Sequence, residues 1–277
     1  MSFVPPPGTT LVCALGAGSV CEVAVVRHDG REQLCKRLRP RMLHEPTARR
    51  ALEREARLLE RARHPTLPEL FESSSDSSGP YLLESCLRGA TLRELVEGWQ
   101  ERGAAMPAAL MAHVVRAAFE ALAQLHALGD DDGPYEIVHG DLGPDHVVLG
   151  ESGQIYFVDF GQARWRGMDR ELCGADRGTL PFVAPELARG DREPDQSSDV
   201  FALAATMAFM ALGRPPCSAE TPAALLVEVS EQGLDLPALA ASDRLDRAAR
   251  AALGDALRFD RSERLLRAAE VREGLGP

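Results

Sequence analysis

The pattern of apolar residues changes character near residue 88 of this 277-residue chain. Before that point, short apolar runs alternate with turn residues, which is typical of strands in an antiparallel sheet. Beyond Gly89, apolar residues recur at helical spacing over long stretches. We therefore expect an α+β structure with two lobes, a small sheet-rich lobe over residues 1–87 and a larger, mainly helical lobe over residues 88–277.

The expected elements follow this division. In the first lobe we expect strands at Thr10–Leu15, Cys21–Val26, Glu32–Leu38, Glu69–Glu72 and Tyr81–Leu83, and a helix at Pro46–Arg63. The serine-rich stretch from Ser73 to Pro80 is interpreted as a loop. In the second lobe we expect helices at Thr91–Arg102, Pro107–Leu128, Ser197–Leu212, Pro222–Glu231, Asp243–Arg258 and Ser262–Glu273, and short strands at Val147–Leu149 and Ile155–Val158.

Composition excludes several classes of function. The formal net charge of −11 disfavours nucleic acid or an anionic membrane as the main partner. The longest apolar run, Val200–Leu212 with Thr206 inside it, spans 13 residues, whereas a bilayer requires roughly 20. The N-terminal sequence lacks the features of a signal peptide, and neither the cysteines nor the histidines show metal-ligand spacing. We expect a cytoplasmic protein with reduced thiols, no membrane span and no structural metal site.

Lysine is almost absent from the chain. Of its 31 basic residues, Lys36 is the only lysine, while asparagine is missing and isoleucine occurs only twice. A strong genomic base bias would account for such depletion. Because a guanidinium cannot replace an ammonium at every position, the survival of Lys36 indicates a functional role.

Two further features lie near Lys36 in the expected first lobe. Gly16 and Gly18 lie between the first two strands, where glycine lets backbone N–H groups approach phosphate oxygens. Glu55 falls on the same apolar stripe of the expected helix as Leu59. An inward carboxylate needs a cation because burying it unpaired is costly, so Lys36 is its expected partner.

Motifs in the second lobe identify the family that the chain resembles. In chain order they are the loop from Ile137 to His146, the triplet Asp159-Phe160-Gly161, the segment from Gly178 to Glu186, Asp199, and Arg264. With the glycine-rich turn, Lys36 and Glu55, they resemble the protein kinase family, and bacterial serine/threonine kinases in particular, over roughly residues 8–275. The resemblance implies a bilobal kinase fold.

The resemblance also implies roles at the nucleotide site. The residues that would bind ATP are Gly16, Gly18 and Val23 above it, Lys36 held by Glu55 on its phosphates, and the backbone near Ser85 and Leu87 on its base. Either Leu83 or Glu84 would lie at the back of the adenine pocket. Asp159 and His146 would hold Mg²⁺ or Mn²⁺.

Further roles concern the acceptor and the framework. Asp141 would accept the proton of the substrate hydroxyl, and Thr179 would hydrogen-bond near it, as is typical of serine/threonine kinases. The framework residues would be Asp199 below the catalytic loop (residues 137–146), Glu186 paired with Arg264, and a hydrophobic column of Leu59, Phe160 and His139.

The chain departs from the family pattern at three positions that bear on activity, and at one further position in the glycine-rich turn. His146 replaces the asparagine that holds a second metal ion, and imidazole suits softer ions than Mg²⁺. A preference for Mn²⁺ is one outcome, and loss of the metal site is the other. Leu34 replaces a small alanine above the base, Gly143 replaces the loop lysine, and Cys21 replaces the third glycine of the turn.

The segment between Asp159 and Glu186 lacks the usual phosphorylation switch. Thr179 is its only hydroxyl-bearing residue, and Gly140 replaces the arginine that pairs with a phosphorylated activation loop in many kinases. We therefore expect that activity does not depend on phosphate in this segment.

Three readings of function follow. The first is an ATP-dependent serine/threonine kinase acting on a protein substrate. The second is a pseudokinase, a binding or scaffold module for a regulatory partner. The third is a small-molecule phosphotransferase, whose catalytic loop often contains the sequence His139-Gly140-Asp141 seen here. The segment from Gly178 to Glu186, with Asp199 and Arg264, resembles a peptide-docking apparatus and disfavours the third reading.

Overall fold

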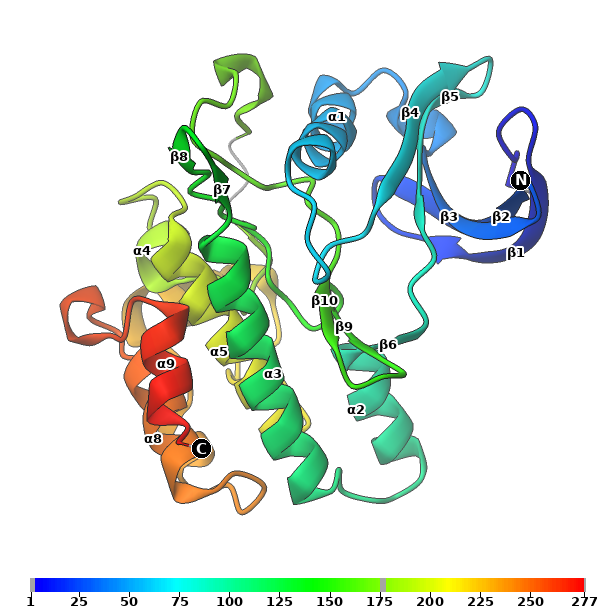
Figure 1. Cartoon of the computed structure of the whole chain (residues 1–277). Helices are drawn as coiled ribbons and strands as arrows, with labels where there is room; N and C mark the ends of the chain where they lie inside the picture. The colour runs from blue at the N-terminus through cyan, green and yellow to red at the C-terminus, as the bar shows by residue number, and fades with distance from the viewer. Residues whose placement is uncertain (1–2, 175–177, 277) are drawn as a thin grey trace.

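The computed structural model describes residues 3–174 and 178–276, which form two lobes (Figure 1). The first lobe contains a five-stranded antiparallel sheet in the order β1-β2-β3-β5-β4, with helix α1 beside it, and the second lobe is mainly helical. This arrangement confirms the predicted α+β, bilobal fold. Residues 175–177, which belong to the predicted segment between Asp159 and Glu186, lie outside the described residues.

The elements have the following bounds. The first lobe contains β1 (Thr10–Ala17), β2 (Cys21–His28), β3 (Arg31–Leu38), η1 (Pro40–Met42), α1 (Pro46–Arg61), β4 (Leu70–Asp76) and β5 (Gly79–Ser85). The second contains β6 (Gly89–Thr91), α2 (Leu92–Glu101), α3 (Ala108–His126), β7 (Gly129–Asp130), β8 (Gly133–Pro134), β9 (Val147–Gly150), β10 (Ile155–Phe157), η2 (Arg170–Leu172), α4 (Pro185–Ala188), α5 (Gln196–Leu212), α6 (Pro222–Val227), η3 (Glu228–Gln232), α7 (Leu236–Ala240), α8 (Arg247–Ala256), η4 (Arg261–Glu263) and α9 (Ala268–Gly274).

Most of the serine-rich stretch is strand and only Ser77 and Ser78 form a turn, so the prediction of a loop from Ser73 to Pro80 was wrong in its extent. Strand β4 continues to Asp76, which pairs with Gly79 of β5. The Arg37 guanidinium on β3 donates to both carboxylate oxygens of Asp76 at 2.7 Å, and the Ser78 amide donates to Asp76 Oδ1 at 2.7 Å. These bonds close a tight turn that the local composition does not reveal.

Several helix ends also differ from the prediction. Helix α8 begins only at Arg247, because the Asp246 side chain caps it by accepting a hydrogen bond from the Ala249 amide. The predicted helix Ser262–Glu273 is divided into η4 and α9, and the predicted helix Pro222–Glu231 turns π-helical at η3. Short elements such as α4 and α7 were not predicted.

Helix α3 lies at the centre of the second lobe. By length and composition it is apolar enough to cross a membrane. Its residues Phe119 and Leu122, however, are fully buried in the main apolar core, and the helix packs against α5 and α9. We therefore interpret α3 as a core helix.

A small sheet between the lobes positions the motif loops (Figure 1). Strands β9 and β10 are antiparallel, with Val147 opposite Phe157, and β6 pairs with the other edge of β9. The loop from Ile137 to His146 leads into β9, and Asp159 follows the end of β10. Both loops therefore meet at the same end of this hairpin, below the first lobe.

Candidate active site

Lys36 lies on the central strand of the first sheet, opposite Val23 of β2 and Leu82 of β5. The residue is 8% exposed. Its Nζ lies 2.6 Å from Glu55 Oε1 on α1 and 3.0 Å from Glu84 Oε1 on β5. The structure thus pairs Lys36 with Glu55, as the helix periodicity indicated, and adds a second carboxylate.

The two carboxylates share one positive charge. Burial by itself would lower the pKa of Lys36, but Glu55, Glu84 and Asp159 outweigh it and hold that pKa well above its ordinary value. Burial raises the pKa of Glu55 to about 7, because Lys36 offsets it only in part and Glu84 adds a like charge. Lys36 therefore stays a charged ammonium, and its positive charge is shared between the two carboxylates.

Glu84, rather than Leu83, lies on the same sheet face as Lys36. Leu83 packs on the opposite face of the sheet with Val26 and Cys35. Glu84 is 1% exposed. Its position at the end of the apolar run Tyr81–Leu83 was visible in the sequence, but the sequence left the register of β5 open.

Glu55 also connects Lys36 to the Asp159-Phe160-Gly161 triplet. Its Oε1 accepts a hydrogen bond from the Phe160 amide at 3.3 Å. The Phe160 ring lies 4.6 Å from the His139 ring between centroids, and Leu59 belongs to the same apolar core as Phe160. The predicted column residues are thus assembled where the two lobes meet.

His146 lies between the two aspartates of the predicted site. Its Nδ1 lies 2.7 Å from the backbone oxygen of Asp141, and its Nε2 lies 3.6 Å from Asp159 Oδ2. Burial would lower the pKa of His146, but Asp159 and Asp141 outweigh burial and raise it. Desolvation would raise the pKa of Asp159, but the nearby His146 and Lys36 have the larger effect and lower this pKa. The His146 imidazole therefore lies between Asp141 of the catalytic loop and Asp159 of the triplet.

The Asp141 carboxylate is held by Gln162, a contact that the sequence did not reveal. Gln162 Nε2 donates to Asp141 Oδ2 at 2.9 Å, and Gln162 Oε1 accepts from the Gly178 amide at 3.1 Å. Thr179 is exposed and lines a small cavity together with Asp141. Gln162 thus joins the catalytic loop to the segment that begins at Gly178.

Asp199 anchors the catalytic loop from α5. The residue is 1% exposed. Its Oδ2 accepts a hydrogen bond from the His139 amide at 2.7 Å, and its Oδ1 accepts one from the Gly140 amide at 2.9 Å. Two buried bonds to a carboxylate orient the loop backbone that carries Asp141.

The glycine-rich turn is tighter than predicted. Strand β1 includes Gly16, opposite Val23, and the turn is closed by the Gly18 amide, which donates to the Cys21 carbonyl at 2.9 Å. Burial raises the pKa of the half-buried Cys21 thiol to about 12, which disfavours the reactive thiolate form. The predicted base contacts Ser85 and Leu87 are half-buried at the end of β5 and just beyond it.

The donor set suits a divalent ion shared with a phosphate ligand. Asp159 supplies a carboxylate whose side chain is 54% exposed, and His146 supplies a nitrogen that faces it. Among residues 3–174 and 178–276, no group of three or more His, Cys, Asp or Glu side chains could hold a metal ion. A two-donor site fits Mg²⁺ or Mn²⁺, which commonly complete their shell with phosphate oxygens and water.

Comparison with known proteins agrees with this geometry. The family model of the protein kinase domain matches residues 10–271. The chain belongs to the protein kinase family. It is 30% identical over 234 residues to "Probable serine/threonine-protein kinase PknB" of Corynebacterium glutamicum, covering 81% of this chain and 34% of that protein. It is 28% identical over 216 residues to "Serine/threonine-protein kinase PknB" of Mycobacterium leprae, covering 75% and 33%. The chain thus spans about a third of the length of these relatives.

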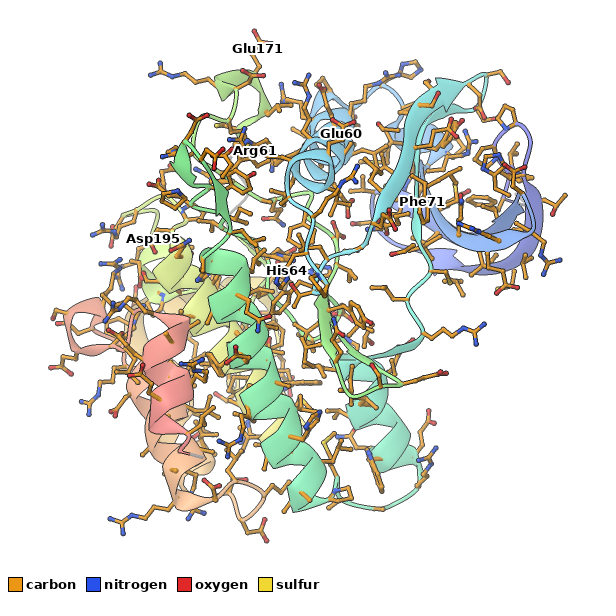
Figure 2. The ribbon with its side chains drawn as sticks, in the orientation of Figure 1. Glu60, Arg61, His64, Phe71, Glu171 and Asp195 are labelled. Atoms are coloured by element: carbon orange, nitrogen blue, oxygen red, sulfur yellow. The ribbon has the colours of Figure 1, made fainter. Side chains whose placement is uncertain are left out.

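In this kinase domain, Arg54 ties helix α1 to the segment after Gly161. The Arg54 residue is 3% exposed. Its Nη1 donates to the Gly161 carbonyl at 2.6 Å, and its Nε donates to the Leu172 carbonyl at 2.9 Å. Figure 2 shows Glu171, next to Leu172, on the same side of the molecule as Glu60 and Arg61 at the end of α1. The first part of the activation segment (residues 159–186) is therefore bound to α1, because its backbone carbonyls accept hydrogen bonds from Arg54.

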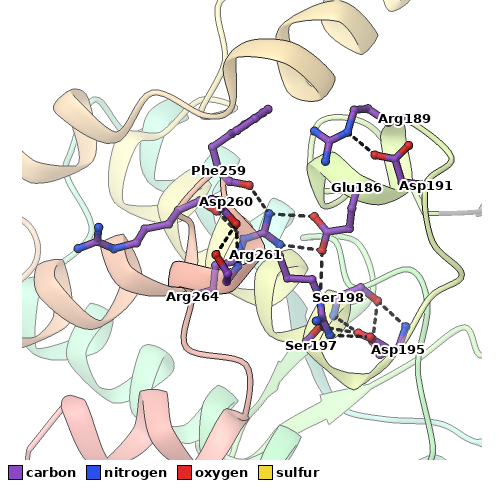
Figure 3. Close-up of polar contacts among 12 residues, drawn as sticks. Glu186, Arg189, Asp191, Asp195, Ser197, Ser198, Phe259, Asp260, Arg261 and Arg264 are labelled. Atoms are coloured by element: carbon purple, nitrogen blue, oxygen red, sulfur yellow. Dashed lines mark hydrogen bonds and ion pairs between the residues drawn. The ribbon is translucent and has the colours of Figure 1, made fainter.

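The far end of the activation segment is fastened to the C-terminal helices (Figure 3). Arg264 Nη1 and Nη2 donate to the two carboxylate oxygens of Glu186 at 2.8 Å each, and both side chains are buried. Next to them, Arg261 Nη2 donates to Asp195 Oδ2 at 2.8 Å at the start of α5. The pairing expected for Glu186 is present.

Proposed function

We propose that this domain is an ATP-dependent kinase that phosphorylates serine or threonine hydroxyls of protein substrates. The observation that carries the proposal is a continuous set of contacts. Lys36 pairs with Glu55, Glu55 accepts from the Phe160 amide next to Asp159, and His146 lies between Asp159 and Asp141. The names of the relatives support the serine/threonine class.

In this proposal, the first lobe binds ATP. Gly16, Gly18 and Val23 cover the nucleotide, the backbone at Ser85 and Leu87 contacts its base, and Lys36 donates to its phosphate oxygens. Because Lys36 remains charged, its ammonium supplies a fixed cation there.

The transfer step requires an acceptor oxygen in line with the γ-phosphorus. The hydroxyl oxygen bonds to that phosphorus, the bond to the bridging oxygen of ADP breaks, and the hydroxyl proton passes to the Asp141 carboxylate. Gln162 and Asp199 keep Asp141 in place. Asp159 and His146 would hold a divalent ion, which when bound neutralises the phosphate charge.

One observation favours the alternative, a nucleotide-binding pseudokinase. Lys36 is held by Glu84 as well as by Glu55, so its charge is more fully compensated than in a site with one carboxylate. We propose a cytoplasmic location and a protein partner for either function.

Phosphotransfer from ATP to a generic protein substrate, with Mg²⁺ or Mn²⁺, tests the kinase proposal. We expect Lys36→Met and Asp141→Asn each to lower the rate by about 100-fold or more. Glu53→Gln on the exposed face of α1 is the control, since the Glu53 side chain is 50% exposed and pairs with Arg57 at the surface. ATP binding without transfer under either metal would establish the pseudokinase reading instead.

A further inference from the structure

Glu84 lies between the two halves of the proposed nucleotide site. Side chains of β5 alternate between the sheet faces, and Leu82 packs towards α1 with Leu52. Glu84, two residues on, shares that face. Across the strands, Leu82 pairs with Lys36 and Glu84 pairs with Leu34. Glu84 is therefore one step nearer than Lys36 to the segment that joins the lobes.

One oxygen of this carboxylate has no partner among the described residues. Oε1 lies 3.0 Å from Lys36 Nζ, whereas the buried Oε2 makes no hydrogen bond with any of them. A buried carboxylate oxygen without a donor is costly and is a candidate for satisfaction by a ligand. The other unpartnered buried atoms of the described residues, Gln33 Oε1 and Arg37 Nε, alternate with Leu34 and Lys36 along β3, so they belong to the opposite face.

The chemistry of Oε2 defines what it can recognise. It is an acceptor only, so its partner must carry an N–H or O–H group. The predicted base position is next to Leu34 and Ser85, the residues opposite Glu84 and after it. A 6-aminopurine offers an amino group with two hydrogens. A 6-oxopurine instead presents lone pairs to a carboxylate.

We propose that Glu84 is a specificity-determining residue that accepts a hydrogen bond from the exocyclic 6-amino group of the bound purine. This inference rests on the proposed function, because it needs a nucleotide in the site. Glu84 then has two roles. Its Oε1 pairs with the Lys36 ammonium that contacts the phosphates, and its Oε2 recognises the base.

A double-mutant cycle between protein and ligand tests the proposal. The dissociation constants of ATP and of purine riboside triphosphate, which has hydrogen at C6, are measured for the wild type and for Glu84→Leu. Any contact between the protein backbone and the amino group is lost equally in the wild type and the variant, so it cancels when their preferences for ATP are compared. We expect the preference for ATP to fall about tenfold in Glu84→Leu, the value of a charge-assisted hydrogen bond. Inosine triphosphate, with oxygen at C6, should bind the wild type more weakly than purine riboside triphosphate does.

Two further variants control the experiment. Glu72→Leu removes a carboxylate from the neighbouring strand β4, where Glu72 accepts from the Tyr81 hydroxyl on the opposite sheet face, and should keep the wild-type preference. Glu84→Gln keeps the side-chain shape and should also show a reduced preference, so the test stands if Glu84→Leu does not fold.

Two outcomes separate this proposal from the proposed function. If the wild type and both Glu84 variants bind ATP with the same preference over purine riboside triphosphate, Glu84 does not read the base, and the kinase proposal is untouched. If the wild type binds no nucleotide with either metal, both proposals fail.

Discussion

His146 is the residue that would decide which divalent ion the proposed site prefers. Its Nδ1 is engaged by the Asp141 backbone oxygen, an acceptor, so Nδ1 carries the proton in the neutral ring. The lone pair is then on Nε2, which faces Asp159. Imidazole is a softer ligand than the amide oxygen found in the family, and this favours Mn²⁺ over Mg²⁺.

We therefore expect ATP with Mn²⁺ to raise the melting temperature of the wild type more than ATP with Mg²⁺. In His146→Asn, which restores an oxygen ligand, the two shifts should become similar. Thermal denaturation with each metal, with and without ATP, measures both. Equal shifts in the wild type and no change in the variant would show that His146 is not a ligand.

Helix α1 is the element that connects the nucleotide site to the activation segment. Its apolar stripe turns Glu55 inward onto Lys36, and the adjacent Arg54 binds the carbonyls of Gly161 and Leu172. A phosphate on the activation segment is one way to fix such a segment, and an arginine with backbone acceptors is another. That activity here needs no activation-loop phosphate stays a prediction.

We expect Arg54→Met to lower the phosphotransfer rate about tenfold or more, because it leaves two buried carbonyls unsatisfied at about 1–3 kcal/mol each. Amide hydrogen exchange over residues 161–172 should become faster. Glu53→Gln, on the exposed face of the same helix, weakens a surface ion pair with Arg57 and should change neither quantity. Identical exchange in the two variants would contradict the role of Arg54.

At the scale of the whole molecule, the activation segment is fixed at both ends. One end is bound to α1 of the first lobe, and the other is bound through Glu186 to Arg264, which lies between η4 and α9 (Figure 3). Arg264 also donates to the Phe259 carbonyl at 2.7 Å. The last helices of the chain therefore support the part of the protein proposed to bind substrate.

We expect Arg264→Met to lower the free energy of unfolding by about 3–5 kcal/mol, because it leaves a buried carboxylate unpaired. Adding Glu186→Leu to that variant should recover part of the loss. Arg258→Met, whose side chain is 48% exposed and pairs with Asp255 at the surface, should lower the free energy of unfolding far less than Arg264→Met does. Urea denaturation of the four proteins checks these values, and equal costs for Arg258→Met and Arg264→Met would refute the explanation.

Local spacing and the order of the motifs were enough to predict one part of this structure. Strand and helix periodicities predicted the two lobes, the stripe on α1 predicted that Glu55 faces Lys36, and the ordered motifs identified the family. These properties are local because neighbouring residues in a helix or strand have fixed directions.

The contacts between residues that are distant along the chain could be seen only in the three-dimensional fold. The register of β3 and β5 brought Glu84 onto Lys36, and the fold of the activation segment brought Gln162 onto Asp141 and Arg54 onto Leu172. The extension of β4 through the serine-rich stretch also depended on a distant residue, Arg37, bonding to Asp76. Such contacts join residues far apart along the chain, and hydrophobic spacing carries no information about which polar side chain will be buried against which partner.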